Sequence, residues 1–234
     1  MSDNFQSLFI DNVNRKHYQV DSSVADSKPI HVVIWPTFSG LSEFEKSIAD
    51  KVASFGYSAT AVDLYGSDRI LESVEEKLSL MGVLLENAES LHGLQRSLTE
   101  QSTANISDKT VVHIGFCLGG RLALEAGLHF KNTVGAVSFH GLMSFNRAAE
   151  NQVNRDLKIM VLNGYDDRSV TDENALAAKQ YWAGLGIDFQ FIDFGNTMHS
   201  FMLPSANNPE HGSMYNPIVA ERGYRYLQGF LNEL

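Results

Sequence analysis

The chain has a single cysteine, Cys117, among its 234 residues, so no disulfide can form within it. Proline is also scarce, with five residues, and no stretch rich in proline, glycine or serine divides the sequence. Such stretches are typical of linkers between domains, and their lack favours one folded domain over residues 1–234. The hydrophobic content of 44% is enough to build a buried core for a domain of that size.

Long apolar runs and clusters of positive charge are missing too. No apolar stretch approaches the roughly 18 residues of a membrane span, and residues 1–6 do not resemble the start of a secretory leader. The formal net charge of -10 repels phosphate backbones and anionic lipid, so we expect neither nucleic acid nor a membrane as a partner. A free thiol needs a reducing compartment, which favours a cytoplasmic protein. The protein is expected to be a monomer or a small homo-oligomer.

Apolar runs that suit buried strands alternate with stretches of helical periodicity along most of the chain. Strands are expected at 30–35, 58–64, 110–116, 133–139, 157–163 and 187–194, and a hairpin or edge strand within 7–20. Helices are expected at 42–55, 118–130, 171–185 and 217–234, with two helices or one broken helix over 71–98. This alternation predicts the α/β class, with a doubly wound, mostly parallel sheet flanked by helices.

Cys117 stands at the centre of Gly115-Phe116-Cys117-Leu118-Gly119-Gly120, between an expected strand and an expected helix. The glycines permit a sharp, strained strand-to-helix turn that exposes the central side chain at the start of the helix. The amide N–H groups of a first helical turn favour a negative sulfur, and the thiolate is the attacking form of cysteine. The pattern therefore indicates a nucleophile, and the alternative is a small buried cysteine packed as a hydrophobe.

The residues that could assist this thiol follow later strands. Asp166 and Asp167 come after the strand expected at 157–163, and His199 comes after the strand expected at 187–194. The order nucleophile, acid, histidine is typical of α/β-hydrolases. We expect Asp167 to orient His199, because in hydrolases of this type the last residue of a Gly-x-x-Asp turn points back towards the histidine loop. Asp166 is expected to cap the turn or to face water.

His140 is the ambiguous member among the eight histidines. It ends the strand expected at 133–139, and loops at strand ends host binding sites. A position on the same rim as the thiol and a purely structural role both remain open.

Several segments together resemble the dienelactone hydrolase family of α/β-hydrolases. They are the cysteine turn at 115–120, Asp63-Leu64-Tyr65-Gly66, Gly164-Tyr165-Asp166-Asp167, His199-Ser200-Phe201, and Tyr215-Asn216 leading into Ala220-Glu221-Arg222. The resemblance runs from about residue 30 to the C-terminus. It implies an α/β-hydrolase fold, and hydrolysis of a small ester or lactone in two steps without a metal or an organic cofactor.

The resemblance also assigns roles to residues. It implies Cys117 as the nucleophile, His199 as the general base and Asp167 as the orienting acid. The backbone N–H groups of Leu118 and Phe38 would form the oxyanion hole.

Two positions depart from the best-known dienelactone hydrolases. Thr37 stands where those enzymes carry a glutamate that helps to activate the thiol, and Leu203 stands where they carry an arginine that binds the substrate carboxylate. Arg69 and Arg168 are the alternatives for binding an anion, but a solvated surface position is the expected role of each. We therefore expect a less charged ester, lactone or thioester as the substrate. Its binding is expected to involve Trp35, Thr37, Phe116, Phe201 and Leu203.

Two other functions remain open. The same triad would serve a thioesterase or a general carboxylesterase, because specificity depends on the pocket. Alternatively, the chain could be a non-catalytic ligand-binding protein, or a redox sensor whose thiol is oxidised. A dinucleotide-binding protein is disfavoured, because residues 115–120 lack the Gly-x-Gly-x-x-Gly spacing.

Overall fold

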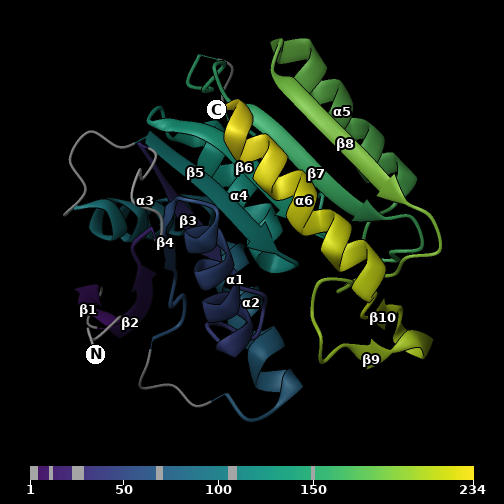
Figure 1. The fold of residues 1–234 in the computed structure, drawn as a ribbon, viewed down its shortest axis with the longest axis horizontal. Coiled ribbons are helices and arrows are strands. Elements are labelled where there is room, and N and C mark those ends of the chain that lie inside the picture. Colours follow the sequence, from purple (N-terminus) through teal and green to yellow (C-terminus); the bar gives the residue numbers. More distant parts are fainter. Residues whose placement is uncertain (1–4, 11–12, 23–28, 67–70, 105–109, 149–150) are drawn as a thin grey trace. The chain divides into compact units, whose positions relative to one another are not determined.

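The computed structural model describes residues 5–10, 13–22, 29–66, 71–104, 110–148 and 151–234 (Figure 1). The chain divides into two compact units, residues 1–112 and 113–234. The expectation of one domain over residues 1–234 stays a prediction.

The first unit contains four strands in the order β1, β2, β4, β3. Their bounds are β1 Phe5–Ile10, β2 Val13–Val20, β3 Ile30–Trp35 and β4 Ser58–Ala61. β1 and β2 form an antiparallel hairpin, as predicted for 7–20, and β2 is antiparallel to β4. β3 and β4 are parallel, and every residue of both strands is buried. Continuous burial is the reason that these strands are near-continuous runs of apolar or small residues.

Three helices belong to the first unit: α1 (Glu43–Ser54), α2 (Val74–Glu86) and α3 (Ala88–Thr103). α1 connects β3 to β4 and begins with the predicted capping box of Ser42 and Glu45. The pattern over 71–98 resolves into two helices, because Asn87 ends α2 and caps α3 by accepting a hydrogen bond from the Ser90 N–H.

β4 ends at Ala61, three residues before the predicted end at Leu64. The backbone turns there, because the Asp63 carboxylate accepts the N–H of Gly66 at 2.9 Å and the N–H of Lys16 at 2.9 Å. A carboxylate that bonds backbone three residues ahead stabilises a turn in place of a strand.

The second unit contains four strands in the order β5, β6, β7, β8. Their bounds are β5 Thr110–Phe116, β6 Thr133–Phe139, β7 Lys158–Gly164 and β8 Asp188–Phe194, and the residues of β5 from His113 onward belong to this unit. β6 with β7 and β7 with β8 pair in parallel, as the sequence predicted. The helices are α4 Leu118–His129, α5 Asp172–Leu185 and α6 Pro217–Glu233.

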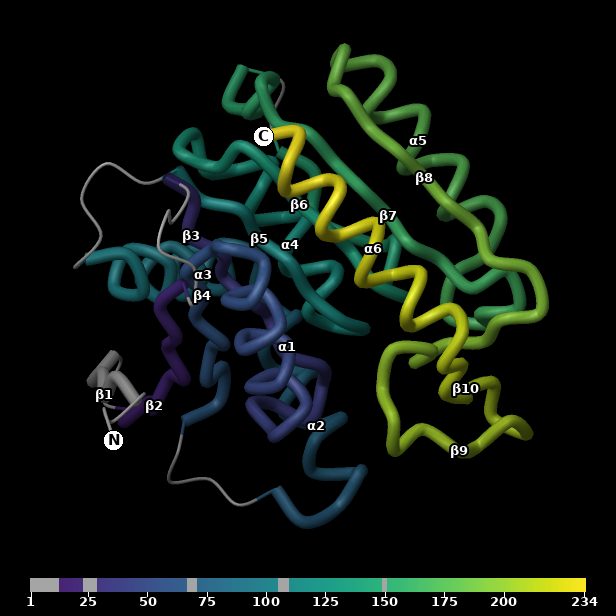
Figure 2. The backbone as a smooth tube through the Cα atoms, viewed as in Figure 1, coloured from purple at the N-terminus to yellow at the C-terminus, as the bar shows by residue number. Residues whose placement is uncertain are grey.

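Helices cover both faces of the sheet in the second unit. α6 crosses the near face in Figures 1 and 2, while α4 and α5 lie behind the strands. Trp182 of α5 is fully buried in the core behind the sheet, and its ring stacks on Phe145 with centroids 5.7 Å apart. Burying one such aromatic side chain contributes about 3 kcal/mol.

A small element between β8 and α6 was not predicted. β9 (Asn207–Asn208) and β10 (Ser213–Met214) pair in an antiparallel ribbon around a short 3-10 helix, Pro209–His211. Strands of two residues show no alternation in the sequence, so periodicity could not reveal them.

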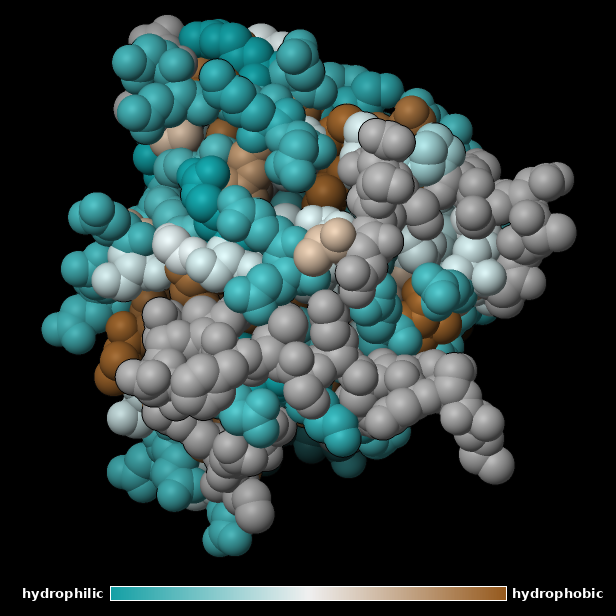
Figure 3. Space-filling view, turned by 90° about the vertical axis from the view of Figure 1, so that its left-hand side faces the viewer, coloured by the Kyte–Doolittle hydropathy of each residue, from teal (hydrophilic) through white to brown (hydrophobic). Residues whose placement is uncertain are grey.

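The face of the molecule in Figure 3 is mostly hydrophilic where it is coloured, with small separate apolar patches. In the part of the chain that the structure describes, none of the helices combines the length and the apolar content that a bilayer crossing requires.

Candidate active site

Cys117 occupies a strained turn between β5 and α4. Its backbone has φ 56° and ψ -115°, a left-handed value of φ that is rare for a residue other than glycine. The turn depends on Gly115, because a Cβ there would lie 2.0 Å from the carbonyl oxygen of Gly119. The Cys117 N–H donates to Phe139 O at 3.1 Å, which fixes the turn to β6. The half-buried thiol therefore sits at the N-terminus of α4, directly before Leu118.

His199 and Asp167 form a hydrogen-bonded pair in the same unit. His199 Nδ1 lies 2.6 Å from Asp167 Oδ2. Asp167 is 3% exposed, and its other carboxylate oxygen accepts the N–H of Ser169 at 2.8 Å. The neighbouring Asp166 is exposed, so the two adjacent carboxylates are distinguished by burial as well as by the bond to histidine.

The surroundings of His199 favour its charged form. Burial opposes protonation, but hydrogen bonds to Asp167 and Cys117, together with the charges of both groups, raise the pKa of His199 to about 10. Asp167 and Cys117 are thus the two groups that favour the imidazolium form of His199. The structure thus brings together the three side chains that the sequence singled out.

The backbone of His199 is anchored by the segment that carries β9 and β10. The His199 N–H donates to Gly212 O at 3.0 Å, and His199 O accepts the N–H of Met214 at 3.0 Å. Arg168 Nη1 donates to Glu210 O at 3.0 Å, so the residue next to Asp167 holds the same segment. The sequence analysis did not assign this anchoring role. A signal for it is Gly212, whose φ of 77° marks a tight turn.

His140 lies beside this pair. Its ring is fully buried, and its centroid is 5.1 Å from that of His199. Burial, and then the charge on His199, hold the pKa of His140 well below its ordinary value of 6.5. His140 is therefore neutral when His199 is charged.

The predicted contributors from the first unit lie at the end of β3 and in the loop that follows it. Trp35 and Thr37 are buried and Phe38 is half-buried. The Thr37 N–H donates to Glu45 Oε1 at 3.1 Å, and burial raises the pKa of Glu45. The loop is thus held by a carboxylate from α1. A role for Phe38 in an oxyanion hole, and for Trp35 and Thr37 in substrate binding, stays a prediction.

The remaining candidates belong to the second unit. Phe116 and Phe201 have fully buried side chains, whereas that of Leu203 is half-buried. Leu118 is the first residue of α4, where an N–H group has no intrahelical partner and can serve an oxyanion. Arg69 lies outside the described residues.

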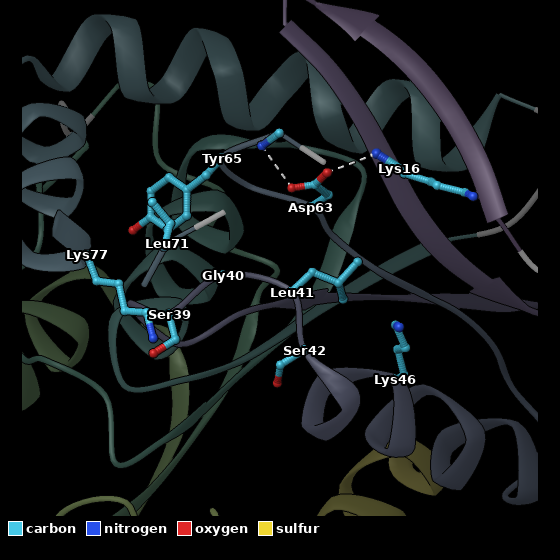
Figure 4. A pocket seen from close by; sticks show the side chains of 11 residues that line it. Lys16, Ser39, Gly40, Leu41, Ser42, Lys46, Asp63, Tyr65, Leu71 and Lys77 are labelled. Carbon is cyan, nitrogen blue, oxygen red and sulfur yellow. Dashed lines mark hydrogen bonds between the residues drawn. The ribbon is translucent and has the colours of Figure 1, made fainter. Parts of the chain in front are cut away.

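A cavity of about 400 Å³ lies within the first unit (Figure 4). Its walls come from β2, the loop before α1, the turn after β4 and α2, and include Lys16, Ser42, Asp63 and Lys77. Both oxygens of the Asp63 carboxylate bond to backbone N–H groups, as the dashed lines show, so this acid stabilises the turn. Across the described parts of the chain, no three His, Cys, Asp or Glu side chains are grouped as they would be to hold a metal ion.

Comparison with known proteins identifies the family. The profile of the dienelactone hydrolase family matches residues 18–234. A protein of Escherichia coli strain K12 with the provisional name carboxymethylenebutenolidase is 23% identical over 213 residues, covering 86% of this chain and 76% of its own. A similarly named protein of Aquifex aeolicus strain VF5 is 27% identical over 188 residues, covering 78% and 77% of the two chains.

Solved structures agree with the fold. The crystal structure of a dienelactone hydrolase-like promiscuous phosphotriesterase from metagenomic libraries is 23% identical, covers 98% of both chains and has a TM-score of 0.86. An esterase of Thermogutta terrifontis is 13% identical, covers 99% of this chain and 94% of its own, and has a TM-score of 0.64. These likenesses confirm the predicted α/β-hydrolase fold. The chain belongs to the dienelactone hydrolase family and is a hydrolase of ester or lactone bonds.

Proposed function

We propose that this hydrolase acts through a Cys117-His199-Asp167 triad and a thioester intermediate. The observation that carries the proposal is the 2.6 Å bond between His199 and Asp167, and the effect of Cys117 on the pKa of His199 supports it. Nucleophile, base and orienting acid are the three parts that acyl transfer by cysteine requires.

The reaction proceeds in two steps. The Cys117 thiolate attacks the carbonyl carbon, and the N–H groups of Leu118 and Phe38 stabilise the tetrahedral oxyanion. The intermediate collapses to a thioester, and the leaving alkoxide takes the proton of the His199 imidazolium. His199, now neutral, removes a proton from water, which attacks the thioester and releases the acid. Cys117 leaves as a thiolate beside a recharged His199, and Asp167 keeps the imidazole in one tautomer throughout.

The proposed substrate is a small, weakly charged ester, lactone or thioester. Leu203, four residues after His199, cannot bind a carboxylate, and its side chain is half-buried. Arg168, the basic residue next to Asp167, donates to the backbone carbonyl of Glu210. Leu203 is uncharged and the Arg168 guanidinium binds backbone, so neither residue is assigned to an anionic substrate.

Steady-state assays on p-nitrophenyl butyrate and on p-nitrophenyl hemisuccinate test the proposal. We expect the wild type to prefer the neutral ester, and Cys117→Ala to lose at least about 10³-fold in kcat on both. A strong preference for the hemisuccinate would contradict the substrate class, and full activity of Cys117→Ala would contradict the triad. A phosphotriester belongs in the panel, because a structural neighbour is named as a phosphotriesterase.

A gain of specificity provides a second test. Leu203→Arg adds a guanidinium at the half-buried position, and Leu203→Gln is the uncharged control of similar size. The arginine variant should shift the ratio of kcat/KM towards the hemisuccinate by about tenfold relative to the glutamine variant. A thiol that reacts with iodoacetamide while no ester or lactone in the panel is turned over would favour the redox sensor.

A further inference from the structure

His140 is fixed at the end of β6, beside β7, the strand that precedes Asp167. It directly follows β6, and its N–H donates to Leu162 O of β7 at 2.8 Å. The preceding carbonyl, that of Phe139, accepts the N–H of Cys117. The φ of His140 is 39°, a left-handed value that a residue with a side chain adopts when its surroundings impose it. The position of the His140 ring is thereby tied to the nucleophile turn.

The His140 ring packs against three other rings. It meets His199 edge-to-face, with centroids 5.1 Å apart and an interplanar angle of 69°. It meets Phe201 in the same manner, at 5.1 Å and 81°. Its third neighbour is Phe116, at 6.0 Å. Phe116 directly precedes Cys117, and His199 and Phe201 belong to the histidine loop. His140 therefore connects the nucleophile turn to that loop.

Side-chain hydrogen bonds do not account for the burial of the His140 ring. Neither of its ring nitrogens has a hydrogen-bond partner among the residues that the structure describes, although the side chain is fully buried. The titratable group that faces it is His199, and its other recorded ring contacts are the uncharged Phe116 and Phe201. Its contribution must therefore come through the faces and edges of the ring.

His199 needs such a contact. Its bond to Asp167 fixes Nδ1 of the imidazole, but a bond at that nitrogen does not by itself fix the plane of the ring. Packing against a rigid aromatic ring restricts this motion. A small swing would break the alignment with Cys117, and a misplacement of about 1 Å can cost about 10²-fold in rate.

We propose that His140 is a positioning residue that holds the His199 imidazole in the orientation joining Asp167 to Cys117. The inference rests on the proposed triad. His140 is not expected to touch the substrate or to exchange a proton.

Four variants test this role. His140→Phe keeps an aromatic ring and removes the nitrogens, His140→Ala removes the ring, and His140→Leu fills the space without a flat ring. The matched control is His113→Ala, because His113 is also a fully buried histidine of this unit and its recorded ring neighbour is Phe130. All four are compared with the wild type by thermal unfolding, by kcat and KM on p-nitrophenyl butyrate, and by the rate of Cys117 alkylation with iodoacetamide from pH 5 to pH 10.

The expected results separate positioning from general stability. At pH 6 the thiolate depends on its pairing with His199, so alkylation of His140→Ala and His140→Leu should fall about tenfold, while at pH 10 it stays within about threefold of the wild type. Their kcat should fall about 10- to 100-fold with KM changed less than about threefold. His140→Phe and folded His113→Ala should stay within about threefold throughout.

Two outcomes would overturn the inference. One is an alkylation rate in folded His140→Ala that follows the wild type at every pH. If the alanine variant does not fold, the same result in folded His140→Leu would overturn the inference. The other is a loss in folded His140→Phe equal to that in the leucine variant. Alkylation does not require ester turnover, so a wild type that is alkylated at pH 6 but hydrolyses nothing would contradict the proposed function while the test of His140 stands.

Discussion

Replacing Asp167 by asparagine should uncouple His199 from the thiol. The rise in the pKa of His199 from 6.5 to about 10 corresponds to about 5 kcal/mol in favour of the imidazolium. Burial works against this rise, and hydrogen bonds and charges of two partners, Asp167 and Cys117, produce it. Because the two partners together also offset burial, equal contributions mean that Asp167→Asn removes at least about 2–3 kcal/mol and more than half of the rise in the pKa of His199.

The same substitution should also select the wrong tautomer. The asparagine amide can donate to Nδ1, which would leave the proton of neutral His199 on the nitrogen that must accept one. We expect kcat to fall about 10²- to 10⁴-fold, as in related triads, with a smaller change in KM.

The assay combines the imidazole NMR titration of His199 with the pH profile of kcat/KM. Asp166→Asn is the matched control, because Asp166 is the adjacent carboxylate and is exposed. It should leave the titration of His199 and kcat within about twofold of the wild type. An unchanged pKa of His199 in Asp167→Asn, or a loss of activity no greater than that of Asp166→Asn, would refute the reasoning.

Two further predictions concern the scaffold. Gly115→Ala should abolish folding or lower the melting temperature strongly in calorimetry, because its Cβ would lie 2.0 Å from Gly119 O. Gly184→Ala, with no atom within 4 Å of its Cβ, should be neutral or stabilising. Equal melting temperatures of the two variants would contradict this. Burial and the charge of Arg15 lower the pKa of His17 to about 4. Between pH 6.5 and pH 4.5 the unfolded chain therefore binds a proton that the folded chain does not, and the free energy of unfolding falls by about 2–3 kcal/mol. In urea unfolding, the destabilisation caused by His17→Gln should therefore be smaller at pH 4.5 than at pH 7.5, and a constant difference would contradict this origin.

The sequence predicted the elements of the fold where each carries its own local signal. β3, β5 and β6 are mostly buried strands with near-continuous apolar runs, and their bounds match the prediction. α1 begins at its capping box. β4 is shorter than predicted because the Asp63 carboxylate binds backbone at two places, one of them far away in the sequence, which periodicity cannot show.

The candidate site was predictable in part for the same reason. Cys117 is flanked by glycines, and Gly115 is needed because a Cβ there would clash with the backbone of Gly119. Asp167 and His199 each follow a strand of one parallel sheet. The support for His199 was not predictable. Its backbone is held at Gly212 and Met214 by long-range bonds, and its ring is packed by His140, whose role depends on contacts in space.

The central claim is that Cys117 becomes acylated during turnover. Rapid-quench mass spectrometry of the intact protein, mixed with excess p-nitrophenyl butyrate and followed by peptide mapping, measures this directly. The account predicts a mass increase of one butyryl group, located on the peptide that contains Cys117, formed at the rate of the nitrophenol burst and absent from Cys117→Ala. Steady hydrolysis by a Cys117→Ala protein, or a butyryl group on a different residue at that rate, would contradict it.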